Sequence, residues 1–295
     1  MKALYDLAAP AKLNLFLHII GQRADGYHLL QSIFVLIDWC DRLHLEKRGD
    51  ARLVRHDLST ELPAEDLCLR AARKLQEASG CTLGVDIHID KQVPSGAGMG
   101  GGSSDAATVL LGLNQLWGLH WPLERLLPVG LALGADVPFF LHGRNAFVEG
   151  IGEVITPIVL TPMVFAVLKP PVSIPTAQLF SSKLLTRDTK PVILAGFPAD
   201  NSVISDFGKN DLQLAAEAHS DQVTQALQIL AKPYGNARMT GSGSAVFARL
   251  NSGKFEPSAR ISSATNSLPD CKIEAGWTGR ICRSLEQHPL VGFCS

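Results

Sequence analysis

No excess of charge of either sign marks this sequence. Lys and Arg number 27 and Asp and Glu number 28, so the formal net charge is -1 at pH 7. A surface that binds nucleic acid through its phosphates needs a basic excess. The charge balance therefore argues against a nucleic-acid partner, but it leaves open a single anionic ligand in one pocket.

Long apolar runs and paired cysteines are missing as well. The most apolar stretch, Val154–Leu168, is broken by Pro157 and Pro162 and is too short to span a bilayer. The N-terminus has charged residues and no apolar signal core. We therefore expect a soluble, cytoplasmic protein with no membrane partner. None of the six cysteines forms a CxxC pair, so we expect buried, reduced thiols rather than a zinc site.

The sequence does have enough apolar residues for a large core. Of the 295 residues, 46% are hydrophobic and 19% are charged, which is typical of a globular chain. This length suggests two domains at the usual size of roughly 100–200 residues each. Prolines concentrate between Thr156 and Pro162, and we place the boundary there, which gives domains at 1–157 and 158–295.

Periodic patterns predict a mixture of strands and helices. Near the N-terminus, every second residue is leucine from 13 to 17, which indicates a strand with Lys12 and Asn14 together on its opposite face. Further strands are predicted at Ser32–Trp39, Asp41–Glu46, Val85–Asp90, Val137–Leu141, Val164–Leu168 and Ala245–Leu250. Helices are predicted at Leu67–Leu75 with Asp66 as its cap, at Ala106–Trp117, before Leu133, at Ala177–Leu185 and at Leu212–Leu230.

The most informative segment is glycine-rich and runs from Pro94 to Ala107, with the sequence PSGAGMGGGSSDAA. It follows a predicted strand and leads into a predicted helix. Glycines let the backbone approach an anion closely, and the first free N–H groups of a helix point toward it. We expect Ser103 and Ser104 to cap the helix and to offer hydroxyls to a phosphate or a metal ion. An ordinary turn with a serine cap is the alternative, but five glycines in seven residues are more than a turn requires.

Three well-known kinds of protein place such a loop over phosphate. A Walker A loop is excluded, since no lysine follows Gly101 or Gly102. Gly96, Gly98 and Gly101 satisfy GxGxxG, yet a dinucleotide-binding fold expects an acidic residue about 20 positions later, and the next helix has none there. Residues 206–208 spell DFG, but the HRD, APE and VAIK segments of protein kinases are missing. None of the three fits well.

The loop instead resembles that of the GHMP small-molecule kinases. Segments similar to that family occur in family order over nearly the whole chain. They are Ala9–Asn14 (APAKLN), Arg23–His28 (RADGYH), the glycine-rich loop, Leu133–Pro138 (LGADVP), Glu149–Glu153 (EGIGE), Ser173–Thr176 (SIPT), Asn210–Leu212 (NDL) and Thr240–Ser244 (TGSGS). RADGYH resembles one branch in particular, whose members act on a cytidine-diphosphate sugar alcohol. The resemblance implies an α+β fold of two domains, with the active site in the cleft between them.

The resemblance also implies roles for individual residues. Asp136 would take the proton of the acceptor hydroxyl, and Lys12 would stabilise the negative charge that moves during phosphoryl transfer. Tyr27 would stack on the cytosine, and His28 would hydrogen-bond its polar edge. The other substrate-binding residues implied are Asn14, Thr176 and Phe180. The ATP-binding residues implied are Lys91, Pro94, Ser95, Gly96, Ala97, Gly98, Met99, Gly100, Gly101, Gly102, Ser103 and Ser104.

The implied reaction transfers the γ-phosphate of ATP to the 2-hydroxyl of 4-diphosphocytidyl-2-C-methyl-D-erythritol, a small-molecule substrate of non-mevalonate isoprenoid precursor synthesis. Mg²⁺ is implied as a cofactor without assigned ligands, and the expected state is a monomer or a homodimer. A kinase of the homoserine or mevalonate type and an inactive nucleotide-binding module are the alternatives. At Asp66 many members have an asparagine that contacts adenine; an ionised aspartate cannot donate that hydrogen bond, so this contact stays open.

Overall fold

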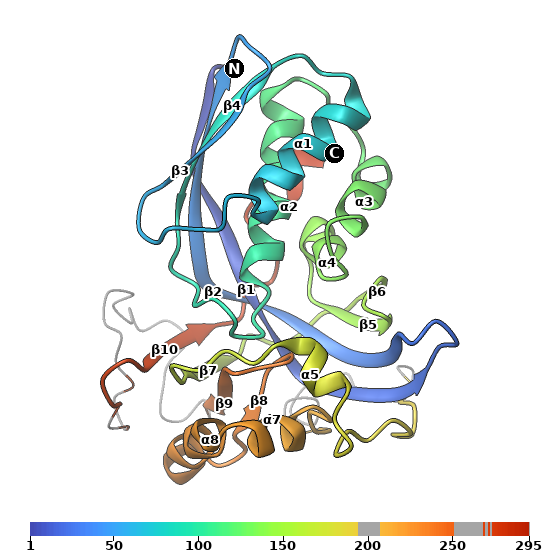
Figure 1. The fold of residues 1–295 in the computed structure, drawn as a ribbon, viewed down its shortest axis with the longest axis vertical. Coiled ribbons are helices and arrows are strands. Elements are labelled where there is room, and N and C mark those ends of the chain that lie inside the picture. Colours follow the sequence, from blue (N-terminus) through green and yellow to red (C-terminus); the bar gives the residue numbers. More distant parts are fainter. Residues whose placement is uncertain (194–206, 251–267, 269–270, 272, 295) are drawn as a thin grey trace.

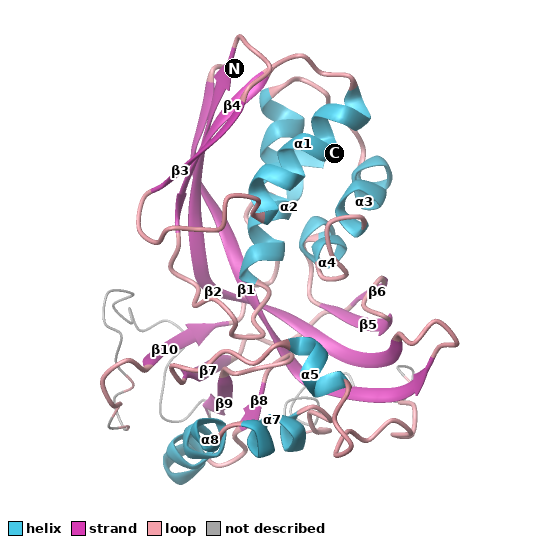
Figure 2. Cartoon of the chain, viewed as in Figure 1, coloured by secondary structure: helices cyan, strands magenta, loops and turns pink. Residues whose placement is uncertain are grey.

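The chain forms two sheets, each covered by helices, as Figure 1 and Figure 2 show. This computed structural model describes residues 1–193, 207–250, 268, 271 and 273–294. The serine-rich segment at 251–270, which no periodic pattern resolves, lies outside the described residues except for Leu268.

A long antiparallel ribbon organises the first sheet. Its strands are β1 (Ala3–Gln22) and β2 (His28–Arg48), and β2 also pairs with β4 (Gly84–Asp90) at one end and with β5 (Ala146–Gly150) at the other. Strand β3 (Leu53–Asp57) runs parallel to β4, and β6 (Val154–Pro157) follows β5. The two strands predicted at 32–39 and 41–46 are thus one strand. A register shift opposite Pro10 and Ala11 interrupts its alternation, as a bulge does.

Four helices accompany the first sheet: α1 (Leu67–Ser79), α2 (Gly101–Leu116), α3 (Leu123–Leu131) and α4 (Val137–His142). The Asp66 side chain accepts hydrogen bonds from the N–H groups of Cys68 and Leu69, which confirms it as the cap of α1. The strand predicted at 137–141 is wrong, since these residues form α4. A short apolar run does not distinguish a buried strand from a buried helix, and Pro138 in the first turn favours the helix.

The second sheet has the strand order β10-β7-β9-β8 and is antiparallel throughout. Its strands are β7 (Val164–Lys169), β8 (Arg238–Met239), β9 (Val246–Leu250) and β10 (Thr278–Arg283). The helix predicted at 212–230 is instead two helices, α7 (Gln213–His219) and α8 (Asp221–Tyr234), because Ser220 between them is extended. The helix predicted at 177–185 is the short α5 (Thr176–Phe180).

Three apolar clusters hold these layers together. One lies between the first sheet and its helices, and one lies in the second unit and includes Leu17 and Ile19 of β1. The third joins the two sheets through residues such as Leu13, Phe165 and Phe247. The C-terminus returns to the first unit, where the carbonyl of Phe293 accepts hydrogen bonds from the side chains of Asn114 and Gln115. All six cysteines are free thiols, but only Cys68 and Cys282 are fully buried and the other four are partly exposed. Within the described ranges, no helix combines the length and the apolar character needed to cross a membrane.

Candidate active site

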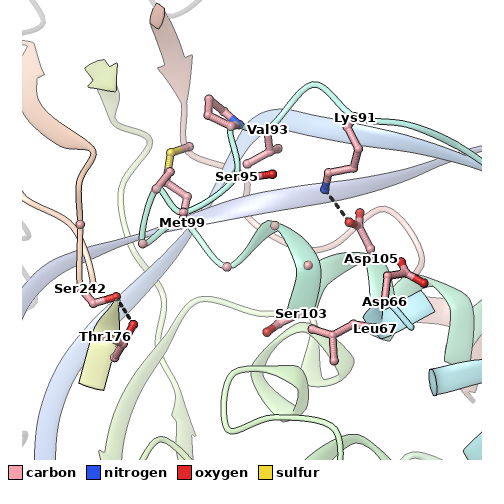
Figure 3. A pocket seen from close by; sticks show the side chains of 18 of the residues that line it. Asp66, Leu67, Lys91, Val93, Ser95, Met99, Ser103, Asp105, Thr176 and Ser242 are labelled. Atoms are coloured by element: carbon pink, nitrogen blue, oxygen red, sulfur yellow. Dashed lines mark hydrogen bonds and ion pairs between the residues drawn. The ribbon is translucent and has the colours of Figure 1, made fainter. Parts of the chain in front are cut away.

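A cleft of about 410 Å³ is lined by residues from both units of the chain. The glycine-rich loop and the first turn of α2 form one wall, and Thr176 and Ser242 stand across from them (Figure 3). Of the predicted ATP-binding residues, all but Ser104 line this cleft. The structure therefore gathers the predicted nucleotide residues around one cavity.

The shape of the glycine-rich loop requires glycine at several positions. Gly96, Gly98 and Gly100 have positive φ angles of 61°, 71° and 71°. A Cβ at Gly98 would overlap the carbonyl oxygen of Thr240, in the glycine turn that precedes β9. The backbone N–H of Ser244 also donates to the carbonyl of Gly96, at 3.2 Å. The second unit thus holds the loop in place through direct backbone contacts.

Helix α2 begins without a side-chain cap. Its N-cap is Gly100 in the left-handed conformation, and Ser103 and Ser104 lie within the first turn, so the prediction that these serines cap the helix is wrong. Only glycine adopts the left-handed N-cap at little cost, which displaces the serines from that position. The N–H groups of the first turn are left without a capping side chain, and this is the arrangement that binds anions.

Lys12 and Asp136 meet at the end of the loop. Lys12 Nζ is 3.4 Å from Asp136 Oδ2 and donates a hydrogen bond of 2.6 Å to Asn14 Oδ1, which confirms that Lys12 and Asn14 share one face of β1. The Lys12 backbone N–H donates to the carbonyl of Met99 in the loop, at 2.9 Å. Lys12 is 3% exposed, whereas the Asp136 side chain is 32% exposed. A buried cation thus faces an accessible carboxylate beside the predicted phosphate site.

Lys91 lines the cleft, but its ammonium group is bound inside the protein. It pairs with Asp41 and, at 2.6 Å, with Asp105 Oδ2, and both carboxylates are buried. Burial alone would lower the pKa of Lys91, but the two carboxylates outweigh it and the pKa is raised. Asp41 Oδ1 also accepts from the backbone N–H of Val93, at 2.7 Å, directly before the loop. This buried triad anchors the base of the loop to β2 and α2.

The predicted substrate residues lie around α5 and the β1–β2 turn. The rings of His28 and Phe180 stack with centroids 4.9 Å apart and planes inclined by 27°. Tyr27 is 59% exposed at the adjacent end of the turn. Thr176, at the start of α5, is hydrogen-bonded to Ser242 across 2.8 Å and lines the same cleft as the glycine-rich loop. Asn14 lies instead with Lys12, where its Nδ2 donates to Ser32 Oγ.

Sequence reasoning missed Asp41, Asp105 and Arg187, which contact the predicted site residues. Arg187 Nε donates to His28 Nε2 at 3.2 Å. Burial, and next the positive charge of Arg187, lower the pKa of His28. Asp105 stands next to the serines of the glycine-rich loop and could have been singled out by that position. Asp41 and Arg187 are far from their partners in sequence and gave no signal.

Comparison with known proteins agrees with this geometry. The model of the GHMP kinases N terminal domain matches residues 66–144, and that of the GHMP kinases C terminal domain matches residues 201–260. The 4-diphosphocytidyl-2-C-methyl-D-erythritol kinase of Methylibium petroleiphilum is 60% identical over 291 residues, which cover 99% of this chain and 98% of that protein. The kinase of the same name from Variovorax paradoxus is 52% identical over the full length of both chains.

Solved structures show the same relationship. The crystal structure of a 4-(cytidine 5'-diphospho)-2C-methyl-D-erythritol kinase matches with a TM-score of 0.71 and 33% identity, over 82% of this chain and 89% of that one. Homoserine kinase from Cytophaga hutchinsonii shares the fold, with a TM-score of 0.66, 15% identity and coverage of 98% and 96%. The α+β, two-domain GHMP fold is thus confirmed.

This chain is a small-molecule kinase of the GHMP class. It belongs to the 4-diphosphocytidyl-2-C-methyl-D-erythritol kinase branch of that family.

Proposed function

We propose that this kinase transfers the γ-phosphate of ATP to the 2-hydroxyl of 4-diphosphocytidyl-2-C-methyl-D-erythritol, a step of non-mevalonate isoprenoid precursor synthesis. The main support for this substrate comes from what the two ends of α5 contact. Thr176 at its first residue lines the nucleotide cleft, and Phe180 at its last residue stacks on His28. A molecule with a reactive alcohol at one end and an aromatic base at the other suits such a site.

In the proposed mechanism, the loop and the first turn of α2 hold the phosphates of ATP through backbone N–H groups. Asp136 is the accessible carboxylate that accepts the proton of the attacking hydroxyl. Lys12 faces this carboxylate and stabilises the negative charge on the transferring group through its buried ammonium. Little covalent chemistry is asked of the protein, because phosphoryl transfer depends on positioning and charge.

The oxygen atoms near the loop suit Mg²⁺ that arrives on the nucleotide. Mg²⁺ in kinases is held by phosphate oxygens, waters and only one or two protein oxygens. Ser103 lines the cleft, and Ser104 Oγ is buried with no hydrogen-bond partner among the described residues. Within the same residues, no group of three His, Cys, Asp or Glu side chains could hold a metal alone. Because Ser104 is fully buried and does not line the cleft, we propose the Ser103 hydroxyl as the protein ligand, where Mg²⁺ would neutralise phosphate charge.

Further proposals concern the two units of the chain, its location and its partners. We propose an ATP-binding unit at 1–157, a second unit at 158–295, a cytoplasmic location, no nucleic-acid or membrane partner, and a monomer or homodimer. Lys91 is retained as a residue of the adenine and ribose region, although its ammonium is held by two carboxylates.

A coupled ADP-release assay over a substrate panel tests the proposed reaction. The panel contains the cytidine-diphosphate methylerythritol, free methylerythritol phosphate, mevalonate and homoserine. We expect rapid turnover of the first alone, because remote binding energy from the cytidine orients the reacting hydroxyl. Comparable turnover of mevalonate or homoserine would reject the substrate while leaving the kinase activity standing.

A further inference from the structure

We infer that Arg187 fixes the tautomer of His28 and thereby selects cytosine over uracil. Arg187 follows α5 by seven residues and is absent from every segment that points to the family. Its guanidinium donates from Nε to His28 Nε2 at 3.2 Å. This inference rests on the proposed function, since it names how that site distinguishes one pyrimidine from another.

The first step concerns which nitrogen of His28 has the proton. A guanidinium has only donors and stays charged at every pH that a protein tolerates. The atom that accepts from Arg187 Nε must therefore have a free lone pair, so His28 Nε2 is unprotonated. The imidazole is then neutral with its proton on Nδ1. Protonation of Nε2 would place a hydrogen against the Arg187 donor, and the lowered pKa of His28 agrees with the neutral ring.

The second step concerns why Arg187 itself cannot turn away. Its Nη2 donates to the carbonyls of Phe180 at 3.0 Å and Ser182 at 3.1 Å, and its Nη1 donates to the carbonyl of Leu185 at 3.3 Å. The guanidinium is thus held by three backbone carbonyls, one from the last residue of α5 and two from the segment that follows it. The same segment presents the Phe180 ring on which His28 stacks. Arg187 is therefore a positioning residue that orients ring and proton together.

The third step is the consequence for the base. His28 Nδ1 has no hydrogen-bond partner in the described part of the chain, so its N–H is free for a ligand. Cytosine presents an acceptor at ring atom N3, whereas uracil presents an N–H donor there. A fixed N–H donor on His28 can therefore hydrogen-bond N3 of cytosine, whereas it would face the N3–H donor of uracil without an acceptor. Without Arg187, His28 is free to change tautomer and to accept from uracil instead.

The decisive experiment compares kcat/KM for the cytidine-diphosphate substrate and for its uridine analogue. Arg187→Met removes the guanidinium, and Lys183→Met removes a charge from an exposed position of the same segment as the matched control. We expect Arg187→Met to lower the cytidine preference by about 2- to 12-fold, the worth of one net hydrogen bond, with KM for ATP unchanged. Lys183→Met should keep the wild-type preference. An unchanged preference in Arg187→Met, with a normal circular dichroism spectrum, would overturn the inference.

A second measurement requires neither the substrate nor any change at Arg187. In wild-type protein with ¹⁵N-labelled histidine, the nitrogen shifts of His28 distinguish the two neutral tautomers, with His28→Gln providing the assignment. We expect the proton on Nδ1. A proton on Nε2 would overturn the inference, whatever the turnover assays give. Failure of the wild-type enzyme to phosphorylate the cytidine substrate, by contrast, would reject the proposed function and leave the tautomer result valid.

Discussion

Replacement of Lys12 by methionine, alone and together with Asp136→Asn, examines whether these two residues act as one unit. Two unit charges 4 Å apart attract by about 4 kcal/mol at an effective dielectric constant of 20. The pair here is separated by 3.4 Å, but the Asp136 side chain is 32% exposed and solvent screens part of the attraction. We therefore expect a coupling of about 1–3 kcal/mol between the two sites.

In rate terms, each single change should be severe, and the second change should cost less when the first is already present. Loss of a general base lowers kcat by about 10²–10⁴, and loss of one electrostatic stabiliser lowers it by about 10²–10³. With the coupling above, the double variant should be about 5- to 150-fold more active than the product of the two single losses. Lys12 Nζ lies 4.4 Å from the centre of the Phe34 ring, and methionine keeps a side chain of similar length in this buried place, so the fold should survive.

The measurement is initial ADP release at saturating ATP and substrate, with calorimetric ATP binding as the check on the nucleotide site. Lys47→Met removes an exposed lysine from β2 and provides the control, which should keep wild-type kcat. All variants should still bind ATP. Losses that multiply fully in the double variant would refute the idea that Lys12 acts through the same transferring group as Asp136.

Three further predictions concern stability, the loop and the base. Burial lowers the pKa of His288 to about 4, so the unfolded chain binds a proton between pH 6.5 and 4 that the folded chain does not. This residue should contribute a loss of about 2 kcal/mol in stability from pH 7.5 to 5 in urea titrations, and His288→Asn should reduce the slope by that amount. Gly101→Val places a Cβ 3.1 Å from Val93 Cγ1, so the loop must shift and KM for ATP should rise by about 10- to 100-fold. The control is Gly49→Val, where the added side chain meets open space and KM for ATP should stay unchanged. Tyr27→Ala should weaken binding of the cytidine substrate by about 5- to 150-fold at constant ATP affinity, and an equal loss for ATP would show a general distortion.

Local patterns in the sequence predicted those features that depend on neighbouring residues. The period of two placed Lys12 and Asn14 on one face of β1, and Asp66 is the cap of α1. Helix α2 was found from its apolar spacing, although Gly100 rather than a serine begins it. The resemblance supplied Asp136, whose contact with Lys12 joins residues more than a hundred positions apart.

Features that depend on tertiary contacts were not predictable in the same way. The five apolar residues at 137–141 cannot be assigned to a strand or a helix by periodicity alone, and Pro138 in the first turn together with packing on α2 and α3 favours α4. The sequence alone did not show that the ammonium of Lys91 is paired inside the protein, because its partners Asp41 and Asp105 come beside it only in the folded chain. Arg187 had no local signal, because its importance comes from a ring that lies 159 positions earlier in the chain.

The most direct test of the central claim is to identify the phosphorylated position by ³¹P NMR. Purified enzyme is incubated with ATP, Mg²⁺ and 4-diphosphocytidyl-2-C-methyl-D-erythritol until ADP release stops. Carbon 2 of the erythritol bears the methyl group and no hydrogen, so a phosphate on its oxygen gives a phosphomonoester signal without three-bond splitting by hydrogen. We predict one such singlet in equal amount to the ADP released. A split phosphomonoester signal, or ADP with inorganic phosphate alone, would contradict transfer to the 2-hydroxyl.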